Sequence, residues 1–145
     1  MVLGLILMTA LFIVGCSDNN ETTGAATVQT EEGLVKIPLD SITTTMQKFD
    51  YDANGIKVTY FAVKGIDGKV RTAFDACDVC GGKKGYHQEG NDVVCDKCGL
   101  SFSVLGLGTK NKGVGCWPSH LTHEIKDNNI IIKTSEIAAG AFRFA

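Results

Sequence analysis

The sequence predicts a small, mainly β domain (β-rich or α+β) with a two-knuckle, four-cysteine metal site like that of a zinc ribbon. Three observations support this fold class. Asn54-Gly55 and Asp67-Gly68 are hairpin turn pairs between runs of high strand propensity. Two Cys-x-x-Cys pairs follow in the second half of the chain. Near the C-terminus, the short segment SEIAAG (135–140) favours a helical turn.

The first strands are expected between Leu34 and Phe74. LVKIPL (34–39) predicts a short strand that ends at Pro38. Three runs joined by the two hairpin turns then form an antiparallel meander. The middle run, 56–63, is apolar on one face throughout and on the other face toward its end, which is typical of a central strand. The meander therefore leads directly into the first cysteine pair.

The later elements are shorter. Val93-Val94 and residues 100–104 are expected as strands on either side of the second cysteine pair, and residues 106–115 as a glycine-rich loop. HEIK (123–126) and IIIKT (130–134) form a hairpin around a turn at 127–129. The helical turn that follows is expected to be capped by Ser135 and ended by Gly140.

The N-terminus has the features of an export signal. Residues 2–14 are apolar and uncharged, but a bilayer span needs about 20 such residues. The run ends in Ile13-Val14-Gly15-Cys16, which resembles a bacterial lipobox and predicts a lipid on the Cys16 sulfur. We expect a signal peptide at 1–15, the lipidated cysteine and a polar flexible linker at 16–33, and one domain at 34–145. An ordinary secretory signal is the alternative.

These features predict a protein anchored by lipid to a cell membrane, on its periplasmic or extracellular side. The net charge is −2 and no basic stripe is visible, so nucleic acid is not an expected partner. No arrangement of residues resembles a catalytic triad, and a non-enzymatic role is favoured.

The two cysteine pairs carry the strongest chemical prediction. Each pair is followed by a glycine, which tolerates a positive φ and lets backbone N–H groups turn toward the sulfurs. Two such turns form a tetrahedral sulfur site for zinc, a single iron or an iron–sulfur cluster. The 14 residues between the pairs leave room for a short hairpin. The predicted ligands are Cys77, Cys80, Cys95 and Cys98.

Uses of these thiols other than metal binding fit the sequence less well. Disulfides persist outside the cytoplasm, but five cysteines remain beside Cys16, an odd number. Neither pair is followed by histidine, as covalent haem attachment requires, and no βαβ setting suggests a thioredoxin-like dithiol. Metal binding is therefore preferred, and disulfides stay open as an alternative.

Cys116 and three histidines are further candidates. Cys116 lies between Gly115 and Trp117, where it is either an additional ligand, a resolving thiol or a buried inert cysteine. His87, His120 and His123 can each reach a metal only if the fold brings them there.

The motifs FDACDVC (74–80), GYHQEG (85–90), VCDKCGLSF (94–102) and GCWPS (115–119) together resemble the cysteine-rich domain of the FtrD-like membrane iron–sulfur proteins. The segment VKGIDGKVRTAF (63–74) fits the same family. The resemblance implies an iron or iron–sulfur redox domain that works with membrane iron-uptake or redox proteins. Members of that family carry several transmembrane helices, whereas this sequence shows only the apolar run at 2–14.

Three functions are consistent with these features. The first is electron transfer or iron handling at a membrane, with zinc as the alternative metal. The second is a structural zinc-ribbon module that docks on a membrane partner. The third is capture of soft metals or thiol–disulfide exchange.

Overall fold

A computed structural model describes residues 27–81, 84–109 and 115–145 of the chain. The predicted signal peptide, Cys16 and the first part of the linker lie outside these residues, as does 110–114 of the glycine-rich loop. The described chain is mainly β, as predicted, and is arranged in three antiparallel sheets. Within it, no helix is long and apolar enough to cross a membrane.

The outer sheet joins the beginning and the end of the described chain. Its strands are β1 (Gln29–Glu31), β2 (Leu34–Pro38), β10 (Asn129–Lys133) and β9 (Glu124–Lys126), in that spatial order. β2 and the β9–β10 hairpin were predicted, and Asp127 and Asn128 make its turn with positive φ angles of 49° and 57°. β1, at the end of the predicted linker, was not predicted.

The central sheet is the predicted meander. It consists of β3 (Gln47–Ala53), β4 (Ile56–Lys64) and β5 (Val70–Phe74), with β4 in the middle. The cysteine sheet consists of β6 (Tyr86–Glu89), β7 (Asp92–Cys95) and β8 (Ser101–Ser103). β6 and β7 are the short hairpin expected between the two cysteine pairs.

The helical elements are short. They are the helix α1 (Thr134–Ala139) and the 3₁₀ turns η1 (Leu39–Ser41), η2 (Val104–Gly106) and η3 (Ala141–Arg143). Gly140 ends α1 as expected, but the predicted cap at Ser135 is wrong. β10 runs directly into the helix, so Lys133 occupies the cap position without a side-chain cap, and the Thr134 hydroxyl donates to the Gly33 carbonyl instead.

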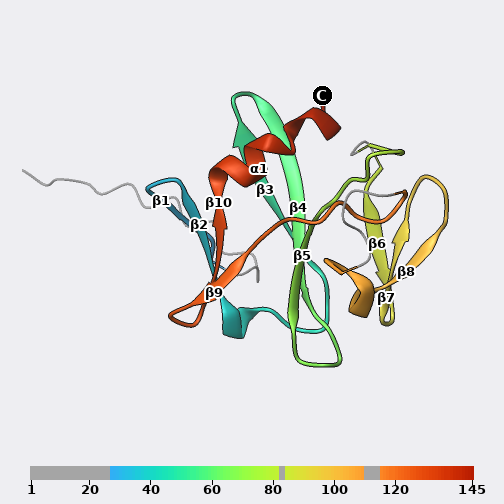
Figure 1. Cartoon of the computed structure of the whole chain (residues 1–145), viewed down its shortest axis with the longest axis horizontal. Coiled ribbons are helices and arrows are strands. Elements are labelled where there is room, and N and C mark those ends of the chain that lie inside the picture. Colours follow the sequence, from blue (N-terminus) through green and yellow to red (C-terminus); the bar gives the residue numbers. More distant parts are fainter. Residues whose placement is uncertain (1–26, 82–83, 110–114) are drawn as a thin grey trace, which may run out of the picture.

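The central sheet lies between the outer sheet and the cysteine sheet (Figure 1), and a hydrophobic core packs against each of its faces. Val58, Tyr60 and Ala62 of β4 face the first core, which also contains side chains of the outer sheet and Ile137 of α1. Phe61 and Val63 face the second core, which they share with the cysteine sheet. Because β4 is buried on both faces at 60–63, both of its side-chain sets are apolar there. The second core is the one that carries the cysteines.

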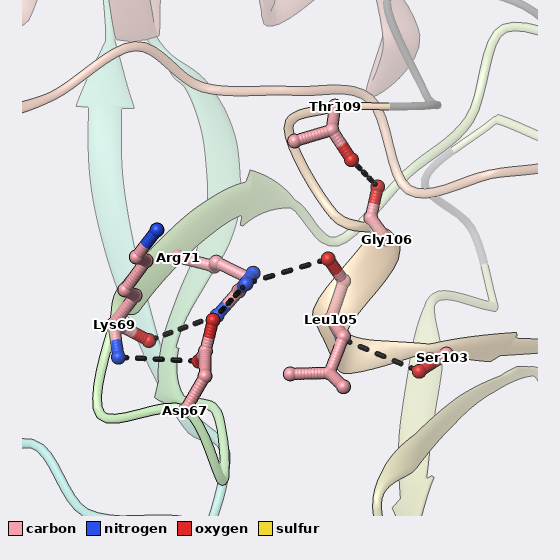
Figure 2. A network of polar contacts seen from close by, with 7 residues as sticks. All are labelled: Asp67, Lys69, Arg71, Ser103, Leu105, Gly106 and Thr109. Carbon is pink, nitrogen blue, oxygen red and sulfur yellow. Dashed lines mark hydrogen bonds and ion pairs between the residues drawn. The ribbon is translucent and has the colours of Figure 1, made fainter.

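A polar network ties the central sheet to η2, which directly follows β8 (Figure 2). Arg71 of β5 binds both carboxylate oxygens of Asp67 at 2.9 and 2.8 Å and reaches the carbonyl of Leu105 in η2 at 3.3 Å. The Arg71 side chain is only 11% exposed. One half-buried ion pair thus holds the β4–β5 turn against η2.

Candidate metal centre

The two Cys-x-x-Cys turns have the same backbone geometry. The N–H of Gly81 donates to the carbonyl of Cys77 at 3.0 Å, and that of Gly99 to the carbonyl of Cys95 at 2.8 Å. Both glycines have φ of 70°, as expected from their position after each pair. The N–H of Cys80 also points at the Cys77 sulfur, 2.9 Å away. These turns are built to present sulfurs, with backbone N–H groups supporting them.

A third segment brings Cys116 to the first turn. Residues 116–120 run beside the end of β5, where the N–H of Phe74 donates to the Ser119 carbonyl and the N–H of Ser119 to the Ala76 carbonyl, each at 2.8 Å. The Tyr86 hydroxyl donates to the Cys116 carbonyl at 2.6 Å. Cys116 is therefore held by contacts on both of its sides.

The five described cysteines are free thiols that gather in two groups. Within each group the sulfurs all lie within 4.8 Å of one another, and Cys80 belongs to both. Among the described residues, these groups contain cysteines and no histidine or carboxylate. The groups are Cys77, Cys80 and Cys116, and Cys80, Cys95 and Cys98.

The sulfur cluster extends from the second core to the surface. Cys77 and Cys95 are 1% and 2% exposed, Cys80 and Cys116 are half-buried, and Cys98 is exposed. Tyr86, Phe102 and Trp117 pack beneath it, with the Phe102 and Trp117 ring centres 4.8 Å apart. The cluster therefore runs from buried thiols in the core to the exposed thiol of Cys98.

The thiols differ in how readily they ionise. Burial acts to raise the pKa of Cys77, but hydrogen bonds, first that from the Cys80 N–H, bring it below its ordinary value. The Leu100 N–H lowers the pKa of Cys98. Burial, together with the neighbouring thiolates, raises the pKa of Cys80 and of Cys116. Without a cation, repulsion between neighbouring thiolates opposes ionisation of the cysteines, and a bound metal ion offsets this repulsion.

A buried carboxylate supports the start of the cysteine sheet. Asp75 accepts the N–H of Tyr86 at 2.8 Å and pairs with Lys48 at 2.7 Å. Burial raises the pKa of Asp75, and Lys48 opposes that effect. A Cβ on Gly85 would overlap this carboxylate, so only glycine fits there. Asp75 thus connects β3, the first cysteine turn and β6.

The C-terminal turn η3 holds the first cysteine turn from outside. Arg143 donates through Nε to Asp78 at 2.7 Å and to the Ser119 hydroxyl at 3.0 Å. Its guanidinium lies 5.2 Å from the centre of the Phe74 ring. Sequence reasoning missed this contact, because 65 residues separate Arg143 from Asp78 and no local pattern marks either.

The three histidines lie outside both sulfur groups. His87 is exposed and binds Asp96 and Glu89, and these carboxylates, Glu89 first, raise its pKa. His123 directly precedes β9 and contacts the Thr72 hydroxyl through Nδ1 at 2.8 Å. His120 pairs with Ala73 as an isolated β-bridge. The segment from His120 to His123 is not helical and leads directly into β9.

Comparison with known families adds to this geometry. Residues 42–144 match the family described as membrane iron-sulfur containing protein FtrD-like. The chain belongs to the FtrD-like family. The resemblance seen in the motifs is thereby confirmed, and the matched region includes all five cysteines of the centre. A comparison with curated proteins found no match.

FtrD-like membership associates the chain with membranes, iron–sulfur chemistry and iron uptake. The thiols suit such a group, because soft sulfur ligands favour iron–sulfur clusters, and the cluster supplies sulfurs without competing oxygen or nitrogen ligands among the described residues. Zinc is bound by the same ligand type. The zinc-ribbon likeness and the identity of the metal stay predictions.

Proposed function

We propose that this protein is a lipid-anchored, non-enzymatic component of a membrane iron-uptake system that handles iron or passes electrons through a cysteine-bound centre. The observation that carries the proposal is the convergence of five free thiols on one end of a protein of the FtrD-like family. Cys77, Cys80, Cys95 and Cys98 would hold the centre, with Cys116 beside them. Bound iron would supply a one-electron redox couple there.

The burial of the cluster supports this role. The inner thiols, Cys77 and Cys95, are excluded from water, which strengthens electrostatic tuning of a redox centre. Cys98 is exposed, so a partner can approach one edge of the centre closely. The rest of the chain holds the thiols and orients them: Asp75 and Tyr86 position the first turn and β6, and Arg143 fixes the outer side of that turn.

The test is metal analysis with an absorption spectrum on the full chain, purified anaerobically in mild detergent. We expect iron, with visible sulfur-to-iron absorption that bleaches on reduction. A double variant, Cys77→Ser with Cys95→Ser, should lose the colour, whereas Cys16→Ser should keep it.

A colourless protein that contains only zinc would contradict the iron proposal. That result would favour the second candidate, a structural zinc module, which the matching geometry of the two glycine-terminated turns supports. A colourless protein without any metal whose thiols oxidise reversibly would favour thiol–disulfide exchange instead.

A further inference from the structure

The five sulfurs form two overlapping groups of three. In a four-thiolate zinc site the metal–sulfur distance of about 2.3 Å places every pair of sulfurs about 3.8 Å apart. Here, among the described residues, the sulfurs that lie within 4.8 Å of one another form groups of three. Neither group contains all four cysteines of the two Cys-x-x-Cys turns. The first group contains Cys116 and no cysteine of the second turn.

We propose that the five cysteines form a centre for two thiolate-preferring cations, in which Cys80 is shared by both. One ion is held by Cys77, Cys80 and Cys116, and the other by Cys80, Cys95 and Cys98. This inference rests on the proposed function only in that the protein binds metal, and it assigns a ligand set and a stoichiometry that the function does not require.

Charge supports two ions rather than one. Five thiolates around one divalent cation leave three negative charges uncompensated, whereas two divalent cations leave one. Uncompensated charge is costly here because Cys77 and Cys95 are buried. In the described part of the chain, two cations near the first turn are each already paired with a carboxylate. Lys48 is paired with Asp75 and Arg143 with Asp78.

The position of Cys116 is built into the fold. Its carbonyl accepts the Tyr86 hydroxyl, and Trp117 packs on Phe102 in the second core. Two residues further on, Ser119 is bound to Ala76 just before the first turn. These contacts hold Cys116 beside Cys77, so the first sulfur group is supported by the packed core.

The test counts ions with Cd²⁺ as the probe. The full chain carrying Cys16→Ser, so that only the five thiols remain, is reduced, freed of metal and loaded with Cd²⁺ anaerobically, and native mass spectrometry gives the stoichiometry. We expect two Cd²⁺ per chain. Cys116→Ser and Cys98→Ser should each retain one Cd²⁺ ion, and Cys80→Ser should bind neither Cd²⁺ ion tightly. Ser101→Ala, an exposed substitution in the same sheet, should retain two.

A second readout uses the unsubstituted thiols, so a variant that fails to fold does not decide the outcome. In the Cd²⁺-loaded parent, all five cysteines should be protected from alkylation, as mapped by peptide mass spectrometry. One Cd²⁺ in the parent, with Cys116 alkylated as fast as in the metal-free chain, would overturn the two-ion centre and leave metal binding intact. Absence of any bound Cd²⁺ in the parent would overturn metal binding itself.

Discussion

At the scale of single residues, His123 shows how burial sets the response of this protein to pH. The Thr72 hydroxyl donates to the Leu121 carbonyl at 2.6 Å, so it has no second hydrogen for His123, and Nδ1 of the histidine must be the donor between them. Burial, and then the charge of His120, lowers the pKa of His123. The folded protein therefore favours the neutral imidazole.

This shift predicts a loss of stability in mild acid. An unfolded histidine has a pKa of about 6.5, so the contribution of His123 is fully present above that pH and is lost as the pH falls toward the lower folded value. His123→Gln keeps a donor for Thr72 but cannot titrate. We expect its melting temperature to fall less than that of the parent between pH 7.5 and pH 5.5, as measured by thermal unfolding.

His87 provides the matched control because its shift has the opposite sign. Its carboxylate partners raise the pKa, so its contribution is present below about 6.5 and is lost as the pH rises through the folded value. The melting temperature of His87→Gln should therefore fall more than that of the parent between pH 7.5 and pH 5.5. Identical pH profiles for the two variants would contradict the assignment.

At the scale of elements, the Asp67–Arg71 pair determines how the central sheet meets η2. The Arg71 side chain is partly buried. It donates to both carboxylate oxygens of Asp67 and also to the Leu105 carbonyl, so it bridges the β4–β5 turn and η2. Asp67→Asn should lower the melting temperature at pH 7. Lys57→Gln, which breaks a pair whose side chains are 71% and 51% exposed, should change it little.

The same pair has a defined pH window. The Arg71 hydrogen bonds hold the pKa of Asp67 well below its usual range. Its contribution is present above the unfolded value of about 3.9 and is lost as the pH falls further. The difference between parent and Asp67→Asn in urea unfolding of the metal-free chains should thus shrink below pH 4. A difference that is constant from pH 7 to pH 3 would show that the charge of Asp67 is not its cause.

The contact between η3 and the first cysteine turn predicts an effect on metal affinity. Arg143 holds Asp78, which lies between Cys77 and Cys80, and the loss of such an orienting partner typically weakens metal binding by about 10-fold. Arg143→Gln should show this in a competition assay with a coloured chelator. Lys36→Gln breaks an ion pair with Glu31 in the outer sheet and should leave the affinity unchanged. Equal metal affinities in the two variants would show that Arg143 packs against the turn without affecting metal binding.

At the scale of the whole molecule, the sequence predicted the elements formed by local patterns but not the contacts between distant segments. The meander, the β9–β10 hairpin and both cysteine turns follow from turn residues and alternation within short windows. The pairing of β2 with β10 joins segments from the two ends of the domain, and no local pattern specifies it. Likewise, the neighbours of Cys116 marked it as unusual, but only the packing of 116–120 along β5 brings it to Cys77.

The N-terminus and the metal centre should be separable in one experiment. The sequence around Cys16 resembles a lipobox, and a single thioether-linked diacylglycerol would raise the mass of a chain that begins at Cys16. Intact-mass analysis of protein from membranes should find that species. Cys16→Ala should lose the added mass yet keep its full metal content, because the thiols of the centre belong to the matched region 42–144. An unlipidated mature chain would indicate an ordinary secretory signal, and loss of metal on this substitution would place Cys16 among the ligands.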